Sequence, residues 1–213
     1  MPRRKVSNPL ALAVLACLAE RPMHPYEMST TMRERGKHES IKLNYGSLYS
    51  VVESLQKHGL IAPRETVKDG RRPERTVYEI TSAGRLELVD WLAELIGTPT
   101  KEYPAFEAGL SMLAGLPPDD VVRLLRQRSA RLHSQLQGGA ELRRYAADMG
   151  VPELFLIEVD YRRGQIEAEI EFVDKLAASI ADGSLGGVDY WRETSRQVAD
   201  GEEVTPFRLP SEK

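Results

Sequence analysis

The chain has little cysteine, few histidines and no long apolar run. A single cysteine, Cys17, excludes an internal disulfide framework. The four histidines (His24, His38, His58 and His133) are too scattered to form a spaced ligand set, so we expect no metal site and no cofactor. No stretch approaches the roughly 20 apolar residues that span a bilayer, so we expect no membrane segment.

Catalytic motifs are also missing from the sequence. It contains no glycine-rich phosphate loop, no metalloprotease helix and no nucleophile elbow. Glu167, Glu169 and Glu171 are spaced by two, so on a helix they point to different sides and cannot work as a paired acid and base. We therefore predict no catalytic residues and no enzyme.

The N-terminus permits two interpretations. Residues 3–5 are basic and Leu10 to Ala19 is almost entirely apolar, which loosely resembles a lipoprotein signal that would be processed at Cys17. However, Asn8 can cap a helix and Pro9 suits its first position. We favour a buried helix, and keep an exported lipoprotein anchored through Cys17 as an alternative.

The first 97 residues have the pattern of a winged helix-turn-helix. Three helices, a β-hairpin and a fourth helix follow one another, and Gly36, Gly59 and Gly97 end the second, third and fourth helices. The expected elements are helices at Pro9 to Glu20, Pro25 to about Arg35, and from the cap Asn44 to His58, strands at Leu60 to Lys68 and Arg75 to Ile80, and a helix from Ser82 to Ile96. Leu86, Val89, Leu92 and Ile96 share one face of that last helix.

The remainder is mostly long helix. A short helix is expected from Ala105 to Leu116. Two long helices follow, one from Asp119 to about Met149 and one from about Pro152 to Ala181, and Gly138-Gly139 interrupts the first of them. Helices this long and narrow cannot bury their apolar stripes alone. The expected domains are 1–97, a winged helix-turn-helix; 98–104, a linker; 105–182, an antiparallel, coiled-coil-like dimerisation and effector domain; and 183–213, a short helix followed by a disordered end. The fold class is mainly α.

The segment IKLNYGSLYSVVESLQKHGLI (41–61) carries a family resemblance through Gly46-Ser47-Leu48-Tyr49. Three further elements agree with it: His24, Tyr26 and Glu27; Gly59 to Ile61; and Arg75 to Tyr78 followed by Thr81 to Gly84. The chain resembles the PadR family of bacterial transcriptional regulators over about residues 8–97, and more loosely beyond. The resemblance implies a DNA-binding regulator, and a small molecule, phenolic acids in the best-known members, that binds near the domain junction and releases DNA.

The third helix has a polar outer face independently of this resemblance. Leu48, Val51, Val52 and Leu55 share the inward face, which turns short polar side chains outward. Such a face can approach a groove of DNA closely. The alternative is an ordinary solvated face with Tyr49 in the core. We expect DNA contacts from Lys42, Asn44, Tyr45, Ser47, Tyr49 and Ser50.

The hairpin carries a cluster of basic residues, consisting of Lys68, Arg71, Arg72 and Arg75. Because this hairpin directly follows a helix-turn-helix, we expect it to hold phosphates or enter the minor groove, rather than to be only a solvated turn. Arg3, Arg4 and Lys5 are either a phosphate-binding arm or an unused tail.

The charge is unevenly distributed along the chain. The net −3 of the whole chain divides into +3 for residues 1–97 and −6 for residues 98–213, and residues 1–85 reach +6. The basic part is therefore the one that would bind nucleic acid.

These observations predict a cytoplasmic, homodimeric repressor that binds double-stranded DNA and pairs through its C-terminal helices. We expect a small aromatic or hydrophobic effector against Tyr103, Phe106, Phe155 and Tyr161. The alternative function is a helical interaction module whose winged domain binds protein instead of DNA.

Overall fold

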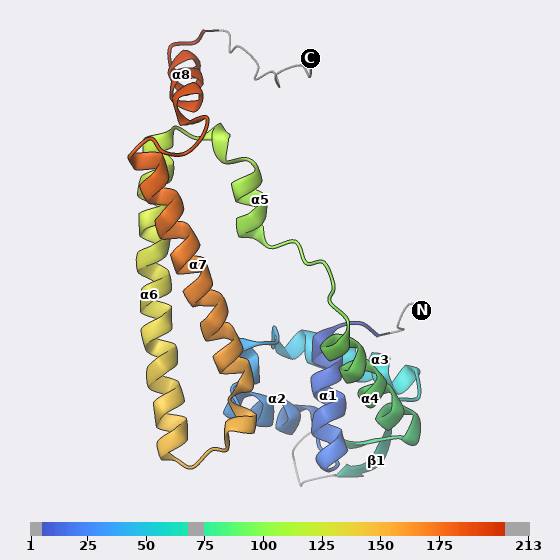
Figure 1. Ribbon diagram of the computed structural model, residues 1–213. Coiled ribbons are helices and arrows are strands. Elements are labelled where there is room, and N and C mark those ends of the chain that lie inside the picture. The colour runs from blue at the N-terminus through green and yellow to red at the C-terminus, as the bar shows by residue number, and fades with distance from the viewer. Residues whose placement is uncertain (1–5, 68–74, 203–213) are drawn as a thin grey trace. The chain divides into compact units, whose positions relative to one another are not determined.

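The computed structural model describes residues 6–67 and 75–202. The chain divides into two compact units, Met1–Lys101 and Glu102–Lys213. Figure 1 shows a small helical bundle with a β-hairpin in the first unit and a long helical hairpin in the second. No helix in the described ranges is long and apolar enough to cross a membrane.

In its described residues, the first unit contains four α-helices, one short 3₁₀ helix and one hairpin. In chain order these are α1 (Pro9–Glu20), α2 (Pro25–Glu34), η1 (Lys37–Glu39), α3 (Tyr45–Lys57), β1 (Ile61–Val67), β2 (Arg75–Ile80) and α4 (Ser82–Gly97). This order and these bounds confirm the predicted winged helix-turn-helix. The expected turn at Asp69-Gly70 lies outside the described residues.

Side-chain caps explain where the helices of this unit begin. Asn8 Oδ1 accepts from Leu10 N at 2.9 Å, and Pro9 occupies the first turn of α1, as the sequence predicts. His24 Nδ1 accepts from Tyr26 N at 3.1 Å at the start of α2, a cap that the sequence analysis did not identify. Each cap satisfies a backbone donor that the first helical turn leaves unpaired.

Helix α1 is the centre of this unit. Its side chains are buried against α2, α3, α4 and the hairpin, in a core that includes Leu10, Val14 and Leu18. Cys17 is 5% exposed in that core, and burial raises the pKa of its thiol. A protonated, buried thiol behaves as a small apolar side chain, which agrees with the helix interpretation of this segment.

The wing is an antiparallel hairpin with an irregularity. Ile61 pairs with Ile80 and Val67 with Arg75, and the register shifts between Pro63 and Glu65. Met23, in the α1–α2 connection, exchanges two backbone hydrogen bonds of 3.0 Å with Tyr78 and adds a bridge to the outer side of β2. One isolated residue has no strand pattern, so this bridge had no signal in the sequence.

Helix α4 differs from the sequence expectation in the face that it buries. Leu88 and Trp91 face the core, whereas Leu86, Val89 and Ile96 are exposed by 68%, 64% and 84%. Gly84 decides this orientation, because a Cβ there would lie 2.0 Å from Leu60 O. Only glycine lets α4 approach the hairpin so closely.

The second unit is built on the antiparallel helices α6 (Pro118–Asp148) and α7 (Ile157–Ala181), joined through η3 (Glu153–Phe155). Before them come α5 (Ala105–Ser111) and η2 (Leu113–Gly115), and after them α8 (Val188–Ala199). Gly138 and Gly139 do not split α6, which runs through both. The expected interruption was therefore wrong.

The core of the second unit lies at the end of the hairpin where α6 begins and α7 ends. Val121 and Leu125 pack there with Val173 and Ile180, and with Trp191 of α8. Figure 1 places α8 at this same end. The opposite end, around the α6–α7 turn, leaves many large apolar side chains exposed.

Candidate nucleic-acid interface

Helix α3 separates an apolar face from a polar one. Leu48, Val52 and Leu55 are at most 2% exposed and anchor the helix to α1 and α2. The first turn and its flank point outward, with Lys42, Asn44, Gly46 and Ser50 exposed and Ser47 half-buried. The inward face therefore agrees with the sequence expectation.

Tyr49 lies on the surface. Its side chain is 45% exposed, so the alternative that placed it in the core is wrong. Burial raises the pKa of the Tyr78 phenol in β2, and the nearby Glu53 carboxylate and Tyr49 phenol of α3 raise that pKa further. The outer face of α3 thus continues onto the wing.

Asn44 has a structural task at this surface. Its Oδ1 accepts from Ser47 N at 2.8 Å and caps α3, and Ser50 Oγ donates to Gly46 O at 3.2 Å. The cap fixes where α3 begins, and the partial positive charge of a helix N-terminus favours a phosphate there. Small side chains in this turn allow close approach to a nucleic-acid backbone.

The basic cluster of the wing is only partly within the described residues. Lys68, Arg71 and Arg72 lie outside them, and Arg75 begins β2. One further cation on the wing was missed by the sequence analysis: Arg64 lies at the register shift of β1, with its Nη1 3.9 Å from Glu79 Oε2. A register shift cannot be recognised from a single strand sequence, so Arg64 had no visible signal.

A groove in the second unit has a volume of about 760 Å³. Its apolar wall includes Leu110, Leu113, Leu116, Leu124, Leu125 and Ile166. Arg128 crosses it, with its guanidinium carbon 3.7 Å from the centroid of the Phe106 ring and its Nε bonded to Glu169. A cation over an aromatic face is a stabilising contact.

The four expected effector residues are not brought together by this groove. Phe106 lines it, whereas Tyr103, Phe155 and Tyr161 are outside its lining and are exposed by 83%, 64% and 68%. Tyr161 accepts from Gln165 Nε2 at 3.0 Å. Within the described ranges, no group of three or more histidine, cysteine or acidic side chains is arranged to hold a metal ion.

Helices α1, α2 and α3 share one core, the β1–β2 hairpin lies beside them, and the capped α3 keeps its outer face exposed. This arrangement defines a winged helix-turn-helix. Residues 14–90 match the Transcriptional regulator PadR-like family, and the first unit therefore carries a domain of that family of transcriptional regulators.

Similar proteins extend this likeness beyond the winged domain. The negative transcriptional regulator PadR of Bacillus subtilis strain 168 is 28% identical over 137 residues, 62% of this chain and 73% of that protein. The crystal structure of Bacillus subtilis PadR in complex with operator DNA has a TM-score of 0.64 at 17% identity, covering 80% of this chain and 98% of that one. The crystal structure of the same Bacillus subtilis protein in complex with p-coumaric acid has a TM-score of 0.63 at 16% identity, covering 79% of this chain and 96% of that one. The two structures show that the fold is shared.

Proposed function

We propose that this protein is a sequence-specific DNA-binding transcriptional regulator that places α3 in the major groove and the wing beside it. The observation that carries the proposal is the division of α3, whose apolar face is buried while its cap Asn44 and the outer residues Gly46, Tyr49 and Ser50 are exposed. The proposed DNA contacts are Lys42, Asn44, Tyr45, Ser47, Tyr49, Ser50, Lys68, Arg71, Arg72 and Arg75.

The regulator acts as a homodimer in the cytoplasm, on a pseudo-palindromic operator. Helix-turn-helix dimers bind two half-sites about 34 Å apart, which requires a pairing surface outside the winged domain. The exposed apolar side chains of α6 and α7 support such a surface in the second unit. Repression is proposed by analogy with the Bacillus subtilis relative, a negative regulator.

A small effector adjusts this binding. Two observations support the effector: the Bacillus subtilis relative was solved with p-coumaric acid, and the apolar groove beside Phe106 has the volume of a small-molecule site. A ligand shifts a regulator only if it binds one DNA-binding state more tightly than the other. Release of bound DNA by a titrated aromatic acid tests this part.

A second candidate function is binding of another protein through the winged unit. It is favoured by the exposed apolar stripe of α4, which includes Leu86, Val89 and Ile96. The same DNA assay separates the two functions, because a protein-binding module retains no DNA.

The test is a mobility-shift titration of the full chain on the DNA upstream of its own gene, against a scrambled duplex. We expect the upstream duplex to be retained more tightly than the scrambled one. Lys42→Ala should weaken binding to both duplexes, because a contact to phosphate does not depend on the sequence. Gln56→Ala, at an exposed position in the last turn of α3, is the matched control and should bind as the wild type does. Absence of retention on any duplex would overturn the proposal.

A further inference from the structure

The groove of the second unit has one apolar end. The groove follows α6 from Val121 to Gln135, a stretch of helix about 21 Å long. Where α6 begins, its wall consists of aliphatic side chains, namely Leu110, Leu113, Leu116, Val121, Leu124 and Leu125. Leu116 and Leu124 are still 45% and 41% exposed there. An apolar group that covered them would be stabilised by its removal from water.

The other end of the groove is lined by polar side chains. Arg131 and Gln135 of α6 lie there with Arg162 and Gln165 of α7, over an apolar floor that includes Ile166. Guanidinium and amide groups donate hydrogen bonds, and a guanidinium forms its strongest bonds with a carboxylate or a phosphate. This end therefore favours an anion.

Two ion pairs show that the contributions of α6 and α7 to the polar end lie at the same level. Arg128 of α6 bonds to Glu169 of α7, and Arg143 bonds to Asp160 further along the hairpin. Arg162 comes between Asp160 and Glu169 on α7. It therefore lies level with the segment of α6 between Arg128 and Arg143, which is the segment that forms the polar end.

Arg128 marks the boundary between the two ends. Its guanidinium carbon lies 3.7 Å from the centroid of the Phe106 ring, and its Nε bonds to Glu169. Among the described residues that line the groove, Glu169 is the one carboxylate, against three arginines, so the lining has a formal charge of +2. Because Arg128 offsets the charge of Glu169, this surplus lies at the polar end.

The unlike ends favour a ligand that is polar at one end only. A phenolic acid carries a hydroxyl group opposite its carboxylate. At the apolar end, Gln127 is the one polar side chain that lines the described part of the groove, and the carbonyl oxygen of Leu116 accepts from Trp191 Nε1. A buried hydroxyl group without a partner is costly. A linear alkyl chain that ends in a carboxylate meets no such cost.

Helix α5 supplies an independent reason for a ligand in the groove. It has seven residues, none of them buried, although Phe106 and Leu110 are apolar and line the groove. A helix this short is unstable without packing. An alkyl chain between α5 and α6 would supply that packing.

We propose that the groove between α5, α6 and α7 binds a fatty acid. The carboxylate lies at Arg131 and Arg162, and the alkyl chain runs past Phe106 toward Leu124 and Leu116. This inference rests on the effector of the proposed function and names its chemical class.

Calorimetric titration of the full chain with hexanoate, octanoate, decanoate and laurate, each below its micelle concentration, tests the site. The dissociation constant should fall about fourfold for each methylene group that enters the apolar end. Dodecylammonium has the same chain as laurate but the opposite charge, and should bind at least about ten times more weakly. A dissociation constant that does not depend on chain length, or equal binding of dodecylammonium and laurate, would overturn the proposal.

Substitutions locate the site on the groove. Arg131→Gln and Arg162→Gln should each raise the dissociation constant of laurate about tenfold, because each removes a charged donor to the carboxylate. Leu124→Asn should weaken laurate more than hexanoate, because it alters the apolar end. Arg123→Gln is the matched control, since Arg123 is an exposed arginine of α6 outside the lining of this groove. Laurate that binds both arginine variants as tightly as the wild type would contradict the proposal.

A mobility-shift assay with added fatty acid separates this proposal from the proposed function. Laurate should release the upstream duplex from the wild type but not, at the same concentration, from Arg131→Gln/Arg162→Gln. A wild type that retains the duplex and binds no laurate overturns the fatty-acid site and leaves DNA binding standing. A wild type that binds laurate but no DNA supports the site and overturns the regulator. Tighter binding of p-coumarate than of laurate, weakened by the same substitutions, would assign the groove to an aromatic acid instead.

Discussion

The indole Nε1 of Trp191 donates a hydrogen bond of 2.8 Å to the carbonyl oxygen of Leu116. This bond joins two residues that are 75 positions apart in the sequence, at the point where α8 meets the segment before α6. Trp191 is 7% exposed in the core of the second unit. Helix α8 is therefore an integral part of that unit.

Trp191→Phe should lower the free energy of unfolding of the second unit by about 1–2 kcal/mol, because it removes this bond and part of the buried volume. Trp191→Ala should lower the same free energy of unfolding by about 3–5 kcal/mol. Urea unfolding followed by circular dichroism measures both. Val198→Ala, at a 65% exposed position of α8, is the control and should change stability little.

Gly84→Ala should destabilise the first unit by about 1–3 kcal/mol, since the added methyl group meets backbone at Leu60 O and the side chain of Ile80. Gly97→Ala, in the same helix but with open space around it, should be neutral or slightly stabilising. Thermal unfolding distinguishes the two. Equal effects of both substitutions would show that the close approach of α4 to the hairpin is not required.

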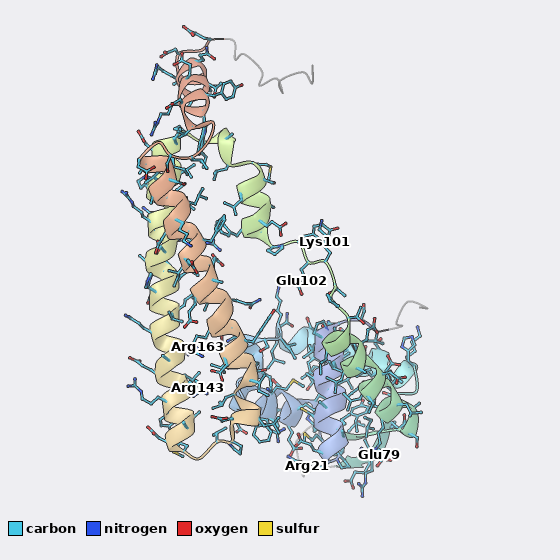
Figure 2. The ribbon with its side chains drawn as sticks, in the orientation of Figure 1. Arg21, Glu79, Lys101, Glu102, Arg143 and Arg163 are labelled. Atoms are coloured by element: carbon cyan, nitrogen blue, oxygen red, sulfur yellow. The ribbon has the colours of Figure 1, made fainter. Side chains whose placement is uncertain are left out.

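Acid should weaken the α6–α7 turn through Asp160. Arg143 on α6 donates to both of its carboxylate oxygens, at 2.6 and 3.1 Å, and Arg163 lies 3.8 Å away. Figure 2 shows both arginines near this end of the hairpin. The hydrogen bond from Arg143 is the main reason that the pKa of Asp160 lies below its ordinary value of 3.8.

A carboxylate with a lowered pKa stabilises the fold above its ordinary pKa and loses that contribution as the pH falls through the lower, folded value. Asp160→Asn should therefore lower the urea midpoint at pH 7 and reduce its decline below about pH 4. Adding Arg143→Gln to the Asp160→Asn variant should lower the urea midpoint at pH 7 little further. An unchanged acid profile in Asp160→Asn would contradict this role of the pair.

The homodimer predicts different masses for the full chain and its first unit. The full chain should scatter as a dimer of twice 23.9 kDa, and a chain ending at Lys101 as a monomer, because the proposed pairing surface lies beyond it. Light scattering at micromolar concentration measures both. A stable dimer of the short chain would place the pairing surface in the first unit, where the exposed stripe of α4 lies.

Local patterns predicted most of the fold. Capping residues, glycine stops and apolar spacing sufficed for α1, α2 and α3, because these features act within a few residues. The face that α4 buries was not predictable in this way. It depends on the contact of Gly84 with Leu60, which is set by tertiary packing.

The buried face of α3 was predictable in the same way. The apolar spacing in α3 predicts which side chains face inward, and so which lie outside. Arg64 and the groove beside Phe106 had no sequence signal, since one depends on a register shift and the other on how α5, α6 and α7 pack. In α6, Leu142, Tyr145 and Met149 are exposed, as expected for a helix too narrow to bury its apolar stripe alone.

The central claim, that α3 and the wing bind DNA, is tested most directly by the salt dependence of binding to the upstream duplex. The logarithm of the association constant should fall linearly with the logarithm of salt concentration, with a slope near −0.9 per phosphate contacted. Arg71→Ala/Arg72→Ala should make that slope shallower by about two, if each arginine contacts one phosphate. Failure to bind any duplex at low salt, or a double variant with unchanged affinity and slope, would contradict the account.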